Sequence, residues 1–364
     1  MTQAFLFRAA ELKDYMIRFF TKLGVPQADA VISADVLLEA DLRGVDSHGM
    51  IRLNSYYGDR IRAGLIDPLT PVTVIRETAT TLTLDGGNGL GHVVSYRAME
   101  ACIAKARQTG VSMVTVRNSN HYGIAGYYAM MALPHDMIGI SFTNSGPLVA
   151  PTYGRKAMIG TNPIAVAAPA GDQAPYVLDM ATSIVPIGRI TVYDKAGKPI
   201  PEGWGINSQG VVTNQPTEVL KGGALMPLGG IDVMRGYKGY GLGLMVDIFS
   251  GVLAGSGFGT EVDIKDGKHT ARTGHFFAAV QIEAFRPIAE FKKDMDELLN
   301  ALKDSPKAVG QERIYIHGEK EFEMAARNTR DGVPLIAPVV EVLRKSGKEV
   351  GVEFDLVAVG EIDK

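Results

Sequence analysis

The stretch from Asp41 to Tyr57 reads DLRGVDSHGMIRLNSYY and carries unusual chemistry for a packing helix. A surface helix that serves only packing places Lys and Glu on its polar face, whereas this stretch offers Ser47, His48 and Arg52. If the segment is helical, His48 and Arg52 are four residues apart and share one face. An imidazole transfers protons near neutral pH, and a guanidinium binds a carboxylate through two hydrogen bonds. The stretch therefore predicts a proton-transfer site beside a carboxylate.

A second stretch, residues 117–126 (RNSNHYGIAG), follows an apolar run and brings His121 to a loop. Glycine and small hydrogen-bonding residues flank both His48 and His121, which gives a ligand access to the backbone. We predict that the chain folds so that these two histidines meet over one substrate. A lone histidine is more often structural, and we keep that interpretation for His92, His135, His269 and His275.

The composition is that of a soluble globular protein with a substantial core. The chain has 364 residues, of which 46% are hydrophobic and 21% charged, and this length suggests two or three domains. The net charge of -3, without a basic patch, makes nucleic acid an unexpected partner. The first turns are polar, which predicts no signal peptide. The most apolar stretch, residues 240–258, is interrupted by Asp247 and several glycines, so we expect no membrane span.

The single cysteine, Cys102, excludes an intrachain disulfide and a cysteine-rich metal cluster. It lies among apolar residues, so we expect a buried structural thiol. A reducing, cytoplasmic location fits this usage. No two histidines are spaced as a metal pair on one helix face, and no metal is expected.

Hydrophobic periodicity predicts a small all-helical unit in the first 65 residues, followed by mixed helices and strands. Strands are expected at 72–75, 81–84, 111–116, 138–143, 176–179, 275–282 and 351–359, and helices at 92–109, 122–133, 286–303 and 318–345. The alternation is irregular, which favours mixed α/β layers over a regular repeat.

The glycine loop at residues 86–91 invites comparison with a dinucleotide fingerprint. The spacing does not fit, because the third glycine is replaced by His92 and no acidic residue follows at the right distance. A tight turn that packs a helix on a strand is the better interpretation. The chain also lacks the Walker A, Gly-x-Ser-x-Gly and His-Glu-x-x-His patterns of other enzyme classes.

Two weaker signals allow either a ligand or a structural role. Asp179 at a strand end suits the hydroxyls of a ribose, but it equally suits a helix cap. Lys238 before a predicted helix suits a phosphate, but it equally suits a solvated loop.

Several ordered segments together carry a family resemblance. They are DLRGVDSHGMIRL, RNSNHYG, GTNPIAVAAP, LDMATS, and YKGYGL followed by an apolar helix. The chain resembles the malate/L-lactate dehydrogenases that lack a Rossmann fold, a family that includes sulfolactate and ureidoglycolate dehydrogenases and diketogulonate reductase. The segments run in order from Asp41 to the C-terminal helix, so the resemblance covers nearly the whole chain.

The resemblance implies a mixed α/β (α+β) fold and a homodimer. A non-Rossmann cofactor domain with a mostly antiparallel sheet is expected within a domain formed by both chain ends. Residues 1–125 and 290–364 would form the discontinuous helical substrate domain, and residues 126–289 the NAD(P)-binding domain.

The implied reaction is hydride transfer between NAD or NADP and a small 2-hydroxy or 2-keto acid, with malate and oxaloacetate favoured. Lactate, sulfolactate and ureidoglycolate are the alternatives within the family. Carried over by position, the catalytic residues are Ser47, His48, Arg52 and His121, and Arg52 and Thr161 bind the substrate. The cofactor-binding residues are His121, Ser145, Asp179, Met180, Ala181, Lys238, Gly239, Gly318 and Glu319. The last segment departs from the family's usual Pro-Gly-Glu, because it reads His317-Gly318-Glu319.

Two other classes of function stay open. A hydrolase could use Ser47 and His48, and it would show no nucleotide dependence. A non-catalytic protein of the same fold would bind NAD(P) without turnover.

Overall fold

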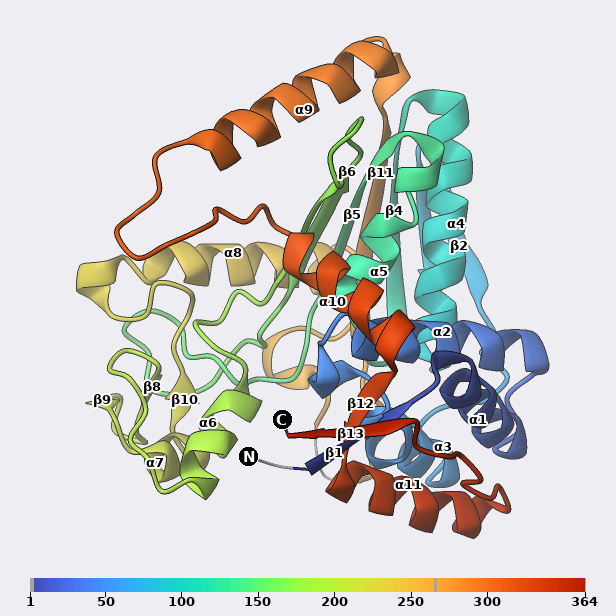
Figure 1. Ribbon diagram of the computed structural model, residues 1–364, viewed down its shortest axis with the longest axis vertical. Coiled ribbons are helices and arrows are strands. Elements are labelled where there is room, and N and C mark those ends of the chain that lie inside the picture. Colours follow the sequence, from blue (N-terminus) through green and yellow to red (C-terminus); the bar gives the residue numbers. More distant parts are fainter. Residues whose placement is uncertain (1–2, 265–266, 364) are drawn as a thin grey trace.

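The computed structural model describes residues 3–264 and 267–363, and its centre is a seven-stranded sheet (Figure 1). The strand order is β2-β3-β4-β11-β5-β6-β7. The strands are β2 Thr73–Glu77, β3 Thr81–Asp85, β4 Val111–Ser119, β5 Met137–Thr143, β6 Ile164–Ala168, β7 Tyr176–Met180 and β11 Thr273–Gln281. Only β3 and β4 pair in parallel, and the other neighbours are antiparallel. The predicted mixed fold with a mostly antiparallel sheet is confirmed.

Helices cover both faces of this sheet. On one face, α4 (Gly91–Thr109) and α5 (Ala125–Met130) bury their apolar sides against the central strands, and Cys102 lies in this core as a free, buried thiol. On the other face, Val246 of α8 (Tyr237–Asp247) packs against Phe276 and Phe142. The helix then continues as a π-helical segment, η5 (Ile248–Val252). With both faces covered, the central strands are apolar on both sides.

The two chain ends meet in a second, three-stranded sheet. β1 (Gln3–Phe7) pairs with β12 (Val333–Ile336) on one side and with β13 (Gly360–Asp363) on the other. The expectation of an all-helical N-terminal unit is therefore wrong, because a strand precedes α1 (Ala9–Lys22) and α2 (Gln27–Leu42). The pairing partner of β1 lies more than three hundred residues away, where local periodicity carries no information.

Two further expectations near the C-terminus are corrected. The predicted helix 318–345 is split into α10 (Glu319–Asp331), β12 and α11 (Ala337–Val350), because Gly332 takes a φ of 111° and ends α10. The last strand is β13, not residues 351–359. Phe354 in that segment packs on the rings of Phe7 and Tyr15, so the segment crosses an aromatic core before it reaches β1.

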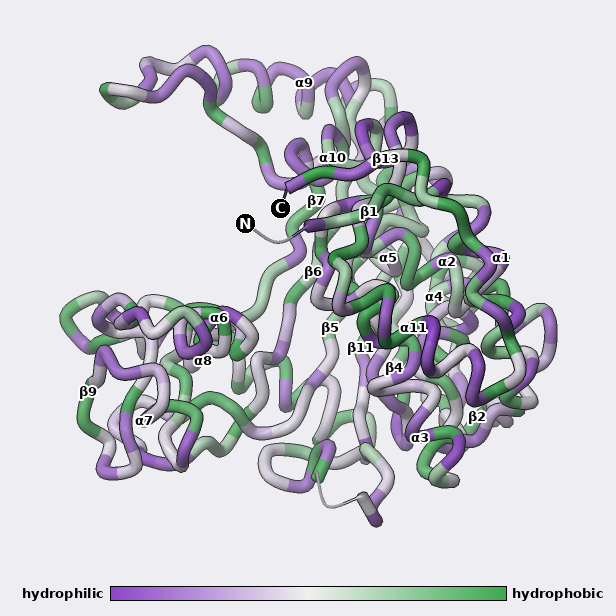
Figure 2. Tube along the Cα trace, turned by 60° about the horizontal axis from the view of Figure 1, so that its bottom comes forward, coloured by the Kyte–Doolittle hydropathy of each residue, from purple (hydrophilic) through white to green (hydrophobic). Residues whose placement is uncertain are grey.

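A smaller lobe stands apart from the main body (Figure 2). It contains α6 (Ile187–Lys195), α7 (Pro216–Leu220) and a three-stranded sheet of β8 (Gly205–Ile206), β9 (Val212–Thr213) and β10 (Ala224–Leu225). Its own apolar core includes Ile190 and Leu225.

An outer helix, α9 (Ile288–Asp304), runs along the edge of the molecule and is followed by a long exposed segment (Figure 1). Among the residues of α9, only Leu299 is buried.

The central sheet takes β2, β3 and β4 from before residue 126 and its other strands from after it. The domain boundaries expected from the sequence stay a prediction. Within the described ranges, no helix has the length and hydropathy needed to cross a bilayer.

Candidate active site

The segment that carries His48 is not one continuous helix, which corrects the expectation from the sequence. A short 3-10 turn, η1 (Asp46–His48), ends at Gly49, and a π-helical segment, η2 (Leu53–Gly58), leads into α3 (Asp59–Arg62). The cause is Asp41, whose carboxylate accepts the backbone N–H of Met50 at 2.8 Å. A Cβ added at Gly49 would lie 1.9 Å from Asp41 Oδ1, so only glycine allows this close approach.

The predicted meeting of the two histidines is confirmed. The rings of His48 and His121 stack with centroids 5.4 Å apart and an angle of 24° between their planes. His121 lies just beyond the end of β4, so the sheet holds one imidazole while the η1 turn holds the other. Both side chains are half-buried.

Each imidazole has different hydrogen-bond partners. Nδ1 of His48 lies 2.8 Å from Oγ of Ser47. Nδ1 of His121 lies 2.6 Å from Oη of Tyr57, and the backbone N–H of Gly123 donates to the same nitrogen at 3.2 Å. Sequence reasoning missed Tyr57, because an aromatic residue in an apolar segment is typical of core packing.

Burial lowers the pKa of both imidazoles. The pKa of His48 falls to about 4, mainly through burial and further through the charge of Arg52. The pKa of His121 falls well below its ordinary value, again mainly through burial and then through His48 and Arg52. Both rings are therefore neutral at pH 7, the form in which an imidazole accepts a proton.

A cavity of about 560 Å³ opens beside this histidine pair. It gathers these residues predicted from the sequence: Ser47, His48, Thr161, Asp179, Met180, Ala181 and Gly318. Segments far apart in the chain meet here, from η1, β7 and the start of α10.

Asp179 lies at the end of β7 and faces the cavity. The backbone N–H of Gly126 donates to its Oδ2 at 2.7 Å. Burial raises the pKa of Asp179 to about 6, although the Gly126 N–H and the charge of Arg43 act in the opposite direction. Arg43 also lines the cavity, and it is a polar residue of the first quoted stretch to which the sequence assigned no role. It pairs with Glu39 at 3.6 Å.

Other predicted residues lie outside the cavity lining. Arg52 is exposed, and its Nε donates to the backbone oxygen of Ser47 at 2.8 Å. Ser145 contacts Thr161 from outside the lining, since its Oγ accepts the Thr161 N–H at 3.1 Å.

The predicted residues of α8 also lie away from the cavity. Lys238 is exposed at the start of α8, and Gly239 packs on the backbone of Leu228. His121 and Glu319 also lie outside the lining.

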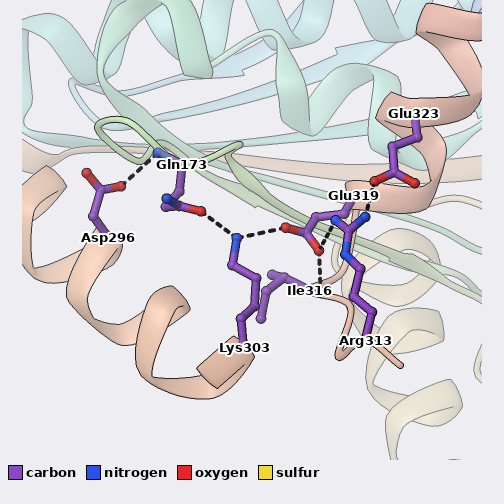
Figure 3. Close-up of polar contacts among 7 residues, drawn as sticks. All are labelled: Gln173, Asp296, Lys303, Arg313, Ile316, Glu319 and Glu323. Carbon is purple, nitrogen blue, oxygen red and sulfur yellow. Dashed lines mark hydrogen bonds and ion pairs between the residues drawn. The ribbon is translucent and has the colours of Figure 1, made fainter. Parts of the chain in front are cut away.

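Glu319 is buried and surrounded by cations (Figure 3). Its two carboxylate oxygens contact Lys303 Nζ at 3.0 Å and Arg313 Nη2 at 3.2 Å, and the N–H of Ile316 donates to Oε2 at 3.0 Å. These contacts direct the carboxylate to the outer helix α9 and to the loop before α10. Glu319 therefore anchors the wall formed by Tyr315 to Gly318, and its direct contact with a cofactor stays a prediction.

The residues present fit a nicotinamide dinucleotide. The cavity volume lies within the ~300–1,000 Å³ typical of cofactor sites. The Asp179 carboxylate can accept hydrogen bonds from ribose hydroxyls. Gly318, the residue that caps the N-terminus of α10, lies on the cavity wall, where backbone N–H groups suit a phosphate. Gly318 takes a φ of 97°, which favours glycine at this approach. Across residues 3–264 and 267–363, no three His, Cys, Asp or Glu side chains converge as metal ligands.

The chain is similar to known proteins over almost its full length. It is 50% identical over 344 residues to a malate dehydrogenase of Pyrococcus abyssi, which covers 94% of each chain. It is 38% identical to an L-sulfolactate dehydrogenase of Methanocaldococcus jannaschii, over 94% of this chain and 96% of the relative. The solved structure of malate dehydrogenase from Pyrococcus horikoshii superimposes with a TM-score of 0.89 at 46% identity, covering 96% of this chain and 97% of that chain. Residues 7–344 match the family described as malate/L-lactate dehydrogenase. The chain therefore belongs to the malate/L-lactate dehydrogenase family.

Proposed function

We propose that this chain interconverts malate and oxaloacetate with NAD or NADP. Its family and relatives make it a 2-hydroxy acid dehydrogenase with a nicotinamide cofactor. The observation that carries the choice of substrate is the 50% identity to malate dehydrogenases over 94% of the chain. The His48–His121 pair beside the large cavity supports the reaction class.

The proposed catalytic residues are Ser47, His48, Arg52 and His121. Oxidation of a secondary alcohol needs a base for the hydroxyl proton, and a neutral imidazole at this site suits that role. When bound, the nicotinamide supplies the hydride acceptor for oxidation and the donor for reduction. Arg52 would hold the substrate carboxylate, because it is exposed and its Nε is fixed by the backbone oxygen of Ser47. Thr161 lines the cavity and would contact the substrate.

The proposed cofactor contacts follow the family segments. They are His121, Ser145, Asp179, Met180, Ala181, Lys238, Gly239, Gly318 and Glu319. The cavity lining supports Asp179, Met180, Ala181 and Gly318 directly. Lys238 and Gly239 rest on their position in the family segment and at the start of α8.

Three related substrates remain alternatives. Sulfolactate, ureidoglycolate and lactate belong to relatives in the same family, and one relative is a sulfolactate dehydrogenase at 38% identity. Each carries the 2-hydroxy acid group on which Arg52 and the histidines would act.

A hydrolase is the second candidate, because Ser47 Oγ lies 2.8 Å from His48 Nδ1. This contact could activate a serine nucleophile. Such an enzyme would cleave esters without any nucleotide.

The test is the change in absorbance of NADH or NADPH with a panel of acids. The panel contains oxaloacetate, pyruvate, sulfopyruvate, oxalurate and 2-ketoglutarate. We expect oxaloacetate to have the highest kcat/KM. A higher kcat/KM for another acid would replace the substrate, and nucleotide binding without turnover of any acid would favour a binding protein. Nucleotide-independent ester cleavage that Ser47→Ala abolishes would favour the hydrolase.

We also propose a homodimer, a cytoplasmic location and the two-domain division at residues 125/126 and 289/290. An exposed apolar row on α8 and η5, formed by Leu244, Ile248 and Val252 at four-residue spacing, supports association. The buried, unpaired Cys102 supports a reducing compartment. Light scattering and cell fractionation test the first two proposals, and limited proteolysis tests the third.

A further inference from the structure

We propose that Tyr57 and the backbone N–H of Gly123 hold His121 in its neutral form with the proton on Nε2. His121 then donates a hydrogen bond to the oxygen on C2 of the substrate, and His48 alone takes the proton. This division of roles rests on the proposed dehydrogenase function.

The contact with Gly123 sets the tautomer. A backbone N–H can only donate, and that of Gly123 points at His121 Nδ1 at 3.2 Å. Nδ1 presents its lone pair to this N–H, which also contacts the hydroxyl of Tyr57, and the single N–H of a neutral imidazole then lies on Nε2. Gly123 takes a φ of 81°, and a Cβ there would lie 2.6 Å from Val36 Cγ1. Both the backbone angle and the space at position 123 therefore favour glycine, whose N–H contacts His121.

Tyr57 fixes the ring in this orientation. Its hydroxyl lies 2.6 Å from the same Nδ1 and 3.4 Å from the backbone oxygen of His121. With the lone pair on Nδ1, the O–H donates to this nitrogen across the shorter contact. Tyr57 is completely buried, and its ring packs on His92 with centroids 4.4 Å apart. Protonation of Nδ1 would bring its new N–H against the N–H of Gly123. His121 is therefore built to donate from Nε2 and not to accept a proton.

The surroundings of His48 are the opposite. Its Nδ1 contacts the hydroxyl of Ser47, which can accept as well as donate. With the proton on Nδ1, His48 has a free lone pair on Nε2, and Ser47 can accept the Nδ1–H before and after a proton is taken up. Ser47 is also exposed to solvent, where a proton can leave.

The hydroxyl O–H bond of the substrate breaks and its proton forms a bond with Nε2 of His48. The bound nicotinamide would supply the acceptor for the hydride that leaves C2 with two electrons, and the electron pair of the broken O–H bond then completes the carbonyl. The carbonyl oxygen accepts the Nε2–H of His121 as its charge changes.

A pair of glutamine variants separates donor from base. His121→Gln keeps an N–H donor near the position of Nε2 and should lower kcat by only ~10-fold, with the acidic limb of the kcat–pH profile retained. His48→Gln removes the base and should lower kcat by ~10²–10⁴, with that limb lost. The reverse pattern, with the limb lost only in His121→Gln, would overturn the assignment.

Tyr57→Phe tests the positioning role. It leaves the Gly123 N–H in place, so we expect the tautomer to persist while kcat falls by ~10-fold and KM and the Kd for NADH stay unchanged. A variant whose KM and Kd rise together with an unchanged kcat would contradict a positioning role.

The tautomer is measured directly by nitrogen NMR of histidine-labelled protein, with His121→Ala to identify the signals. We expect a proton on Nε2 of His121 in the wild type, and also in Tyr56→Phe, which removes the hydroxyl of the adjacent tyrosine. A proton on Nδ1 would overturn the proposal. This measurement needs no turnover, so it decides the tautomer even if the wild type reduces no 2-keto acid and the proposed function fails.

Discussion

The imidazoles of His48 and His121 stack 5.4 Å apart between centroids, although one belongs to a 3-10 turn and the other to a loop after a central strand. Each ring therefore depends on a different part of the fold for its position. We expect His48→Ala or His121→Ala to lower kcat by ~10²–10⁴, because each removes a group beside the reacting oxygen. The Kd for NADH should change much less, and steady-state kinetics with fluorescence titration measures both.

His135→Ala is the control for these variants. Its side chain is exposed and contacts Arg107 at 2.6 Å. We expect wild-type kcat from it. Wild-type kcat from His48→Ala or His121→Ala would remove that histidine from the mechanism.

Arg52 is expected to bind the substrate carboxylate. Arg52→Lys replaces a planar fork with a single ammonium and loses the Nε contact with the Ser47 backbone. We expect KM for the 2-keto acid to rise ~10-fold with a smaller change in kcat. Arg62→Lys is the matched control, since Arg62 is an exposed neighbour paired with Asp59. An unchanged KM in Arg52→Lys would assign the carboxylate to another residue.

Buried histidines make the stability depend on pH. Burial lowers the pKa of His92 to about 3, whereas an unfolded histidine titrates near ~6.5. Between these values the unfolded chain binds a proton that the folded chain does not, so stability falls as the pH is lowered. Each such histidine contributes up to ~1.4 kcal/mol per pH unit.

His92→Leu isolates one of these contributions. Leucine has a similar volume and no nitrogen, and both ring nitrogens of His92 are buried without a hydrogen-bond partner in the described chain. We expect the slope of unfolding free energy between about pH 6.5 and 4 to become shallower by up to ~1.4 kcal/mol per unit. Urea titrations over this pH range measure the slope, and an identical slope in both proteins would contradict the prediction.

Local patterns were enough to predict much of the fold. Alternation and apolar periodicity predicted α4 and every strand of the central sheet except β6, because these elements bury one or two regular faces. The pairing of β1 with β12 and β13 could not be predicted, since it joins distant segments. The break at Gly49 was also missed, because its cause is the side chain of Asp41, which lies near the end of α2 and outside the segment that breaks.

The site was predictable where the chemistry of a side chain is unusual for packing. His48 and His121 satisfied that condition, whereas Tyr57 did not, because a buried aromatic residue is ordinary. Glu319 lay in a recognisable segment, but its cationic partners Lys303 and Arg313 come from α9 and the following loop. Only the folded chain shows that they surround it.

Glu319 should act on cofactor binding through the cavity wall. Glu319→Gln removes the carboxylate that Lys303 and Arg313 share and weakens the loop that holds Gly318 (Figure 3). We expect the Kd for NADH to rise ~10-fold and the unfolding free energy to fall by ~1–3 kcal/mol. Glu323→Gln is the control, because Glu323 is exposed and contacts Arg313 at 2.5 Å. Equal changes in the Kd for NADH and in the unfolding free energy in both variants would show that Glu319 contributes no more than Glu323.

Gly49 gives the sharpest test of how the fold sets the position of His48. A Cβ at Gly49 would lie 1.9 Å from Asp41 Oδ1, so Gly49→Ala must displace the carboxylate that holds the Met50 N–H. That hydrogen bond ends the η1 turn, and its loss should move His48 away from His121. We expect kcat to fall by ~10²-fold, since a shift of about 1 Å at a reacting group has this effect, while the Kd for NADH changes little. Gly188→Ala is the matched control, because a Cβ there meets no atom within 4 Å, and it should keep wild-type kcat. If Gly49→Ala folds and retains full kcat, the Asp41 contact does not determine the position of His48, and the base must be held by other contacts of the η1 turn.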